Sequence, residues 1–230
     1  RGTWHAFRQY FTNVGARARS ELIVWFEPDL LPGYVWSFPL GDGSANVGFG
    51  ILRDRCHRVQ DMGKLWPDIL ARPHVREVLG PDAEPEDRHT AWPIPADLGH
   101  LPLSSGCVLF AGDAAAATDP LTGEGIGQAL ETGRLAVQSI VEAGADATQA
   151  AARYEKDLKA TLIPDHRLAR LLSVGLSTQR GARASLAVAG ATDWTRRNFA
   201  RWLFEDYPRA TLATPQRWQR DVFTRPGAYR

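Results

Sequence analysis

The chain of 230 residues is long enough to bury a sizeable core and to form one or two domains. Its composition, 44% hydrophobic and 23% charged, is that of an ordinary globular protein, and the formal net charge of +1 argues against nucleic acid as a partner. The sequence contains no apolar run of the roughly 18 residues that a membrane span needs. Cys56 and Cys107 are too few for a disulfide framework or a metal site, which favours a cytoplasmic protein with reduced cysteines.

Strand patterns dominate the first hundred residues. The chain opens on an aromatic, strand-like stretch, and residues 21–26 form an apolar, β-branched run. Residues 33–40 and 45–51 both alternate between two faces and are joined by a Gly/Asp turn, which predicts an antiparallel hairpin. Residues 90–95 predict another strand, and its two prolines favour an edge position.

The first strand of this hairpin carries a row of aromatic residues. Tyr34, Trp36 and Phe38 share one face of the strand, whereas Val35 and Ser37 share the other. Aromatic side chains on a sheet most often pack in a core, and the alternative is that this row lines a ligand pocket.

Helical patterns begin near residue 60. Residues 60–79 have helical spacing, and Pro67 and Pro73 are predicted to break the run into short pieces. A long helix is predicted to follow residue 125 and to end at Gly144. Its single apolar face consists of Ile126, Leu130, Val137 and Val141, with Ala129, Gly133 and Ile140 beside them. Three further helices are predicted over residues 147–162, 165–179 and 182–204, and Pro164 is expected to separate the first two.

The order of these elements defines the fold class. Strands fill the first half, helices fill the second, and one strand-to-helix crossover joins them. This order predicts an α+β fold or part of an α/β fold.

The crossover carries the motif with the clearest chemistry. An apolar run over residues 107–111 ends on Gly112-Asp113, and a loop rich in Pro and Gly then leads into the long helix. An aspartate at a strand tip can accept hydrogen bonds from sugar-like hydroxyls, and glycines let the backbone approach a ligand closely. The helix N-terminus adds free N–H groups and partial positive charge. The segment therefore predicts a site for a polar cofactor.

This segment resembles the second flavin motif of the FAD-dependent oxidoreductases of the aromatic-hydroxylase superfamily. Residues 33–40 and 45–50, with the patterns Tyr-x-Trp-x-Phe-Pro and Asn-Val-Gly-x-Gly, resemble the geranylgeranyl reductase family more specifically. The resemblance runs from about residue 7 to residue 142. It implies an antiparallel substrate-binding sheet over residues 1–105 and the second half of a Rossmann-like FAD domain over 106–145. A helical C-terminal region over 146–230 would follow.

The resemblance also implies roles for individual residues. Asp113 would accept hydrogen bonds from the ribityl chain of FAD, and the N–H groups of Gly125 and Ile126 would face the flavin pyrimidine edge. Tyr34, Trp36 and Phe38 would line an apolar substrate pocket, and no side chain is implied as catalytic because the flavin delivers the hydride. The implied cofactor-binding residues are Gly112, Asp113, Pro120, Thr122, Gly123, Glu124, Gly125 and Ile126. For Glu124, a charge that complements the helix dipole is favoured over a catalytic role.

One departure from the family is decisive. The family begins with a dinucleotide fingerprint, Gly-x-Gly-x-x-Gly, that holds the FAD pyrophosphate, and this sequence has none. Gly48-Phe49-Gly50 and Gly123-Glu124-Gly125 are both too short. The chain is therefore interpreted as the C-terminal part of an oxidoreductase, and the N-terminal FAD half is expected as a missing partner.

The implied function is reduction of prenyl C=C bonds by an FAD enzyme, with NAD(P)H or a ferredoxin-like protein as electron donor. One alternative is an FAD-dependent monooxygenase that hydroxylates an aromatic or polyketide-like substrate. Another is a truncated, non-catalytic module that binds an apolar ligand.

Two further features of the sequence bear on metals and on membranes. The six histidines lack ligand spacing, so surface or loop positions and no metal are expected. The stretch after Arg196 mixes arginines with aromatic residues, which is typical of a solvated helix face whose aromatic residues dock on the body. The alternative is peripheral contact of this stretch with an anionic membrane.

Overall fold

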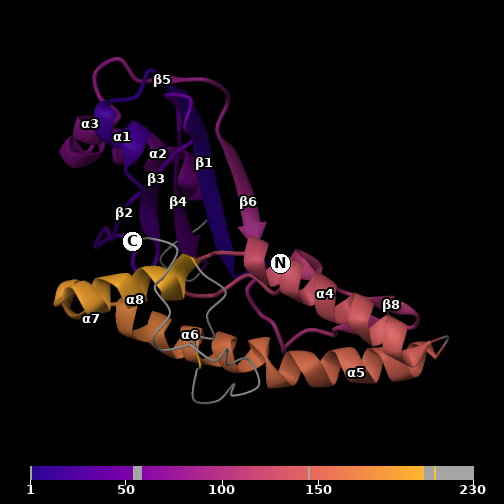
Figure 1. Ribbon diagram of the computed structural model, residues 1–230. Coiled ribbons are helices and arrows are strands. Elements are labelled where there is room, and N and C mark those ends of the chain that lie inside the picture. Colours follow the sequence, from indigo (N-terminus) through magenta and orange to yellow (C-terminus); the bar gives the residue numbers. More distant parts are fainter. Residues whose placement is uncertain (1, 54–58, 145, 205–209, 211–230) are drawn as a thin grey trace. The chain divides into compact units, whose positions relative to one another are not determined.

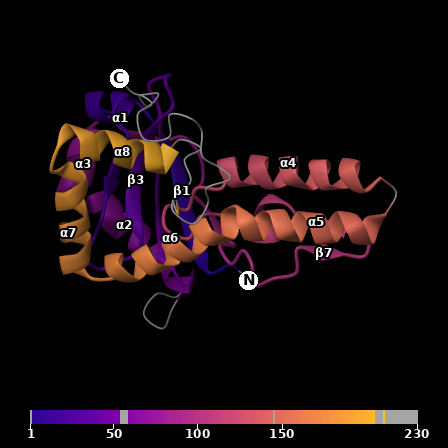
Figure 2. The ribbon, with the colours of Figure 1, turned by 60° about the horizontal axis from the view of Figure 1, so that its bottom comes forward.

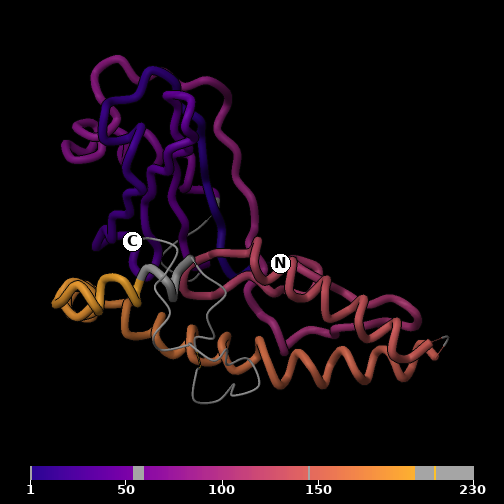
Figure 3. Tube along the Cα trace, in the orientation of Figure 1, coloured from indigo at the N-terminus to yellow at the C-terminus, as the bar shows by residue number. Residues whose placement is uncertain are grey.

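The computed structural model describes residues 2–53, 59–144, 146–204 and 210, with side chains up to residue 199 in the last helix (Figure 1). The chain forms two compact units, the sheet unit (Thr3–Ile94) and the helical unit (Pro95–Arg230). Figure 3 follows the path of the chain, which in its described part forms the large sheet together with three helices first and the five C-terminal helices afterwards. The predicted antiparallel sheet and the helical C-terminal region are both confirmed. The three-part domain division stays a prediction.

The sheet unit contains one six-stranded sheet with the order β2-β3-β4-β1-β5, and β6 also pairs with β1. Every pairing is antiparallel. The strands are β1 (Trp4–Thr12), β2 (Ile23–Trp25), β3 (Tyr34–Pro39), β4 (Ala45–Leu52), β5 (Glu84–Pro85) and β6 (Thr90–Ile94). The predicted hairpin is β3–β4, in which Trp36 lies opposite Gly48. The predicted edge strand is β6.

One face of this sheet is covered by helices (Figure 1). These are α1 (Ala16–Ser20), α2 (Met62–Ala71) and α3 (Pro73–Leu79), with the 3₁₀ turn η1 (Val59–Asp61) before α2. Val35, Val47 and Phe49 are fully buried and belong to the same core as Trp66 and Ile69 of α2. Because side chains alternate along a strand, Tyr34, Trp36 and Phe38 occupy the opposite face.

The expected break at Pro67 is wrong, because Pro67 lies inside α2. Its ring removes one helical hydrogen bond, but Gly63, whose carbonyl loses that bond, is exposed to solvent. Trp66 and Ile69 on either side are buried in the core, so packing holds the helix together across the proline. Pro73 does separate two helices, as the first residue of α3.

The helical unit begins with a two-stranded sheet of β7 (Ser104–Ser105) and β8 (Val108–Leu109), followed by the 3₁₀ turn η2 (Gly112–Ala115). Its helices are α4 (Ile126–Ala143), α5 (Ala147–Ala160), α6 (Leu162–Leu176), α7 (Gln179–Gly190) and α8 (Asp193–Phe204). Figure 2 shows α4 and α5 running side by side. Leu135 of α4 and Tyr154 and Leu158 of α5 lie in one core cluster.

Two predicted helix boundaries in this unit are wrong. Pro164 lies in the first turn of α6, where its missing N–H costs no helical hydrogen bond, and the chain breaks at Thr161 instead. The predicted helix over residues 182–204 is two helices, α7 and α8. The hydroxyl of Thr192 accepts a hydrogen bond from the Thr195 N–H at 3.0 Å and so caps the start of α8.

The apolar face of α4 is exposed, although the sequence pattern alone resembles a core-facing stripe. Ile126 is 77% exposed, Leu130 71%, Val137 61% and Val141 73%. The buried side of the helix is instead formed by small and mixed residues, which are Thr132, Leu135, Ala136 and Ser139. The most apolar surface of this helix is therefore available for contact.

Among the described residues, no helix combines the length and the apolar character needed to cross a membrane. Cys107 is exposed and has no disulfide partner, and Cys56 lies outside the described residues. The side chains of the predicted aromatic tail beyond residue 199 also lie outside the described part of the chain.

Candidate functional site

The turn at Gly112 lies directly against α4. Gly112 has φ +55°, in the left-handed region that favours glycine, and a Cβ added there would stand 3.2 Å from the Cβ of Ala129. Its N–H donates to the Thr132 hydroxyl at 2.9 Å. A glycine is therefore required both by the backbone conformation and by the close approach to the helix.

Asp113 follows in the 3₁₀ turn η2 and is exposed. One of its carboxylate oxygens accepts a hydrogen bond from the Thr118 hydroxyl at 3.1 Å. A Cβ added to Gly125 would stand 3.2 Å from that hydroxyl and 3.9 Å from the Asp113 carboxylate. Asp113, Thr118 and Gly125 thus converge, although the first and the last are twelve positions apart in sequence.

The loop between them is closed on Asp119, a residue to which the sequence reasoning gave no role. Asp119 is 1% exposed, and one carboxylate oxygen accepts from the N–H groups of Leu121 (3.0 Å) and Thr122 (2.8 Å) and from the Thr122 hydroxyl (2.9 Å). The backbone also closes on itself, since Gly123 N–H donates to the Asp119 carbonyl at 3.0 Å. An Asp followed by a Pro is the available sequence signal for such a side-chain-closed turn. This closure holds Pro120, which is buried, and the half-buried Thr122 in place.

The N-terminus of α4 emerges from this loop. Glu124 accepts a hydrogen bond from the Gly127 N–H at 2.8 Å, which agrees with its predicted interaction with the helix dipole. The N–H groups of Gly125 and Ile126 make no hydrogen bond with any residue in the described part of the chain. Two free donors therefore lie beside the exposed Asp113 acceptor, an arrangement that suits a polar ligand carrying both hydroxyls and carbonyl oxygens.

A buried histidine supports the same loop from α6. His166 is 2% exposed, and its Nε2 lies 3.0 Å from the carbonyl oxygen of Ala117. Because a carbonyl only accepts hydrogen bonds, Nε2 carries the proton. Burial lowers the pKa of His166 to about 4, so the ring is neutral at physiological pH. The expectation of a surface or loop position is wrong for this histidine, since its partner is a carbonyl that sequence spacing does not reveal.

No group of three or more metal-ligating side chains is found among the described residues. The loop donors and the Asp113 acceptor are all backbone N–H, hydroxyl or carboxylate groups arranged around a helix start. They match the chemistry of the ribityl chain and pyrimidine edge of a flavin, and the dinucleotide fingerprint for a pyrophosphate is absent from the sequence.

The second group of predicted site residues lies on the sheet face opposite the helices. The Trp36 ring centroid lies 6.0 Å from that of Tyr34 and 5.9 Å from that of Phe38. The Trp36 Nε1 donates to the side-chain oxygen of Asn46 at 3.2 Å. Burial raises the pKa of Tyr34 to about 12, so its phenol stays protonated. The three aromatic residues therefore form one continuous row along β3.

Glycines on β4 make room for this row. Gly48 lies opposite Trp36 and Gly50 lies opposite Tyr34. A Cβ on Gly48 would stand 2.4 Å from a ring carbon of Trp36, so the indole lies directly over the glycine backbone. The aromatic side chains can thus lie flat across the sheet, which creates an apolar surface along β3 and β4.

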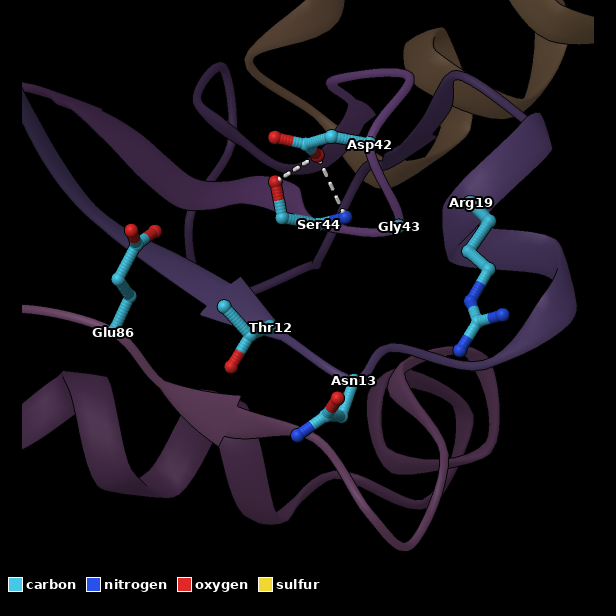
Figure 4. Close-up of a pocket in the computed structure, with 7 residues that line it drawn as sticks. All are labelled: Thr12, Asn13, Arg19, Asp42, Gly43, Ser44 and Glu86. Carbon is cyan, nitrogen blue, oxygen red and sulfur yellow. Dashed lines mark hydrogen bonds between the residues drawn. The ribbon is translucent and has the colours of Figure 1, made fainter.

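A polar cavity of about 350 Å³ lies elsewhere in the sheet unit, and Figure 4 shows its lining residues. They are Thr12, Asn13, Arg19, Asp42, Gly43, Ser44 and Glu86. Asp42 accepts hydrogen bonds from the backbone and the hydroxyl of Ser44. No large apolar side chain lines this cavity, so it does not suit a prenyl chain, and none of the predicted site residues lies in it.

Comparison with known proteins identifies the sheet unit. Residues 5–74, which include the whole aromatic row, match the geranylgeranyl reductase catalytic domain. The match covers less than half of the chain and shows that this segment is similar to the geranylgeranyl reductases. The resemblance inferred from the hairpin and the flavin-like motif is thereby confirmed. Reductases of this family are FAD-dependent.

Two curated relatives illustrate the relationship. The chain is 31% identical over 137 residues to a digeranylgeranylglycerophospholipid reductase from Methanocella arvoryzae, covering 56% of this chain and 32% of the relative. It is 35% identical over 122 residues to a menaquinone reductase from Mycolicibacterium smegmatis, covering 51% of this chain and 28% of the relative. The matched region thus spans about a third of the length of these reductases.

The same fold occurs in a solved structure. A geranylgeranyl bacteriochlorophyll reductase-like protein from Thermoplasma acidophilum superposes with a TM-score of 0.68 at 21% identity, covering 93% of this chain and 54% of that one. This similarity extends the relationship in fold to nearly the whole chain, including the helical unit.

Proposed function

We propose that this chain is the substrate-binding and C-terminal part of an FAD-dependent reductase that saturates C=C bonds of prenyl lipids. The observation that carries the proposal is the aromatic row on the sheet face opposite the helices, inside the segment that matches the reductase catalytic domain. The row offers the flat, apolar contact that a prenyl chain needs. The names of the relatives, which refer to a digeranylgeranyl phospholipid and to menaquinone, support a prenylated substrate.

The loop of the helical unit is proposed to hold the flavin. Asp113 accepts hydrogen bonds from the ribityl hydroxyls, and the free N–H groups of Gly125 and Ile126 donate to the pyrimidine edge. The partial positive charge of the α4 N-terminus stabilises negative charge there. Bound FAD, once reduced, supplies the hydride for C=C reduction. The aromatic row orients the prenyl chain. Saturation of the C=C bond takes up one proton in addition to the hydride, and this proton is proposed to come from solvent.

The proposed partner is a dinucleotide-binding FAD half of the same flavoenzyme. This half supplies the pyrophosphate fingerprint that the sequence lacks. It also covers the exposed apolar face of α4, from Ile126 to Val141, because a stripe this apolar is costly to leave in water. NAD(P)H or a ferredoxin-like protein is the proposed electron donor.

The proposed flavin-binding role of the loop is tested by measuring the flavin affinity of the intact enzyme that contains this chain. Asp113→Ala should weaken FAD binding by about 1.5–3 kcal/mol, the range for a hydrogen bond to a charged group. Asp82→Ala is the matched control, because Asp82 is an exposed aspartate of the sheet unit outside the loop. Equal flavin retention in both variants would show that Asp113 does not hold the ribityl chain.

Turnover tests the reaction class. The reductase proposal predicts loss of a prenyl double bond with matched consumption of the electron donor. Rapid O₂-dependent NADPH oxidation coupled to a hydroxylated product would instead identify a monooxygenase. An intact enzyme that remains colourless after FAD addition would favour a non-catalytic module.

A further inference from the structure

The helices α6, α7 and α8 expose large apolar side chains. Leu171 and Val174 on α6 are each 69% exposed, and Val188 on α7 and Trp194 on α8 are each 67% exposed. On α7, Ala182 is the one buried side chain among the residues described. Three consecutive helices thus present apolar groups to water that their own unit does not cover.

The same segment has a strong positive charge. Residues 162–204 contain seven arginines, two aspartates and no glutamate or lysine, a formal net charge of +5, whereas the whole chain carries +1. Arg167, Arg180, Arg183 and Arg197 are exposed and form no ion pair or hydrogen bond within the described part of the chain. These four cations are therefore available to a partner.

The arginines and the apolar residues alternate on shared helix faces. Arg167 lies one turn before Leu171, and Val174 continues that stripe along α6. On α7, Arg183 and Leu186, which is 47% exposed, are three residues apart and are therefore neighbours on the helix surface. On α8, Arg197 follows Trp194 at a spacing of three. Each helix therefore offers a cation and an apolar group together.

We propose that α6, α7 and α8 form a docking surface for an anionic lipid membrane. Lipid headgroups carry the negative charge that matches the free arginines, and the apolar side chains enter the boundary between headgroups and acyl chains. Arginine suits this position because its aliphatic stem can lie along apolar surface while the guanidinium stays in water. The surface brings the enzyme to the membrane in which a prenyl-lipid substrate resides, and to that extent it rests on the proposed function.

Vesicle co-sedimentation of the full chain tests this surface without flavin or turnover, so its outcome is separate from that of the proposed function. Vesicles of phosphatidylcholine mixed with phosphatidylglycerol should bind the chain, and vesicles of phosphatidylcholine alone should bind it far more weakly. Binding should also fall when the ionic strength rises from about 0.1 M to about 1 M, because the Debye length falls from about 10 Å to about 3 Å.

Charge reversal identifies the residues involved. Arg180→Glu with Arg183→Glu should weaken binding to the anionic vesicles by at least about 25-fold, since each lost cation near the surface costs about fivefold. Arg76→Glu with Arg88→Glu is the matched control, because both arginines are exposed and lie outside these helices. Circular dichroism of all variants checks that they remain folded.

Three outcomes would overturn the proposal. One is no binding to anionic vesicles at low salt, and another is equal loss of binding in the test and control variants. The third is a salt-insensitive dimer in sedimentation velocity that Trp194→Ser dissociates, which would assign the surface to a second copy of the chain.

Discussion

Replacing His166 with glutamine tests how this buried histidine supports the loop between Asp113 and Asp119. The histidine lies on α6 and donates from Nε2 to the Ala117 carbonyl, which belongs to the stretch between Asp113 and Asp119. The glutamine Nε2 can occupy the same donor position and does not titrate. The substitution therefore preserves the hydrogen bond and removes the acid–base behaviour.

The sign and the size of the effect follow from the lowered pKa of His166. The pKa is about 4 in the folded protein because of burial, against 6.5 in the unfolded chain. Between these two values the unfolded chain binds a proton that the folded protein does not, so stability falls as the pH falls from about 6.5 towards about 4. At pH 4 this lowered pKa reduces the free energy of unfolding by about 3 kcal/mol, because each unit of difference between the two pKa values is worth about 1.4 kcal/mol.

Urea unfolding of both proteins at a series of pH values measures this effect. Between pH 7 and pH 4 the wild-type free energy of unfolding should fall by about 3 kcal/mol more than that of His166→Gln. His89→Gln, at an exposed histidine of the sheet unit, is the control for the substitution itself. Parallel profiles for wild type and His166→Gln would refute the burial of a neutral imidazole at this position.

Two substitutions test the other parts of the site. Gly48→Ala should destabilise the sheet unit by about 1–3 kcal/mol in chemical denaturation, because the new methyl group would stand 2.4 Å from both the Trp36 indole and the Phe7 carbonyl oxygen. Gly50→Ala, whose methyl group would stand 3.9 Å or more from its neighbours, should be tolerated, and equal losses would contradict the ring placement. Asp119→Ala should cost about 2–3 kcal/mol and speed amide exchange at Thr122, whereas Asp119→Asn, which keeps the acceptor oxygen, should cost less. Unchanged exchange in both variants would show that the carboxylate does not close the loop.

The sheet unit was predictable from the sequence because residues close together in the chain determine its strands and its hairpin turn. Alternation along residues 33–40 and 45–51 with a two-glycine turn defines both the hairpin and the face that carries the aromatic row. Periodicity cannot reveal contacts between distant residues. The neutral His166 depends on a carbonyl 49 residues away, and the closure of the loop on Asp119 depends on backbone N–H groups whose direction no pattern encodes.

The helix α4 shows most clearly where sequence pattern and structure diverge. Its strongest apolar stripe, from Ile126 to Val141, is the side exposed to water, and the side that packs in the unit carries Thr132 and Ser139. Thr132 can be buried because its hydroxyl accepts from the Gly112 N–H and donates to the Gln128 carbonyl. The polar side of the helix is thus occupied by the turn that presents Asp113, and the apolar side stays exposed. Under the proposed function this stripe is the surface that the FAD half covers, and it begins at Ile126, the residue whose N–H group is proposed to face the flavin.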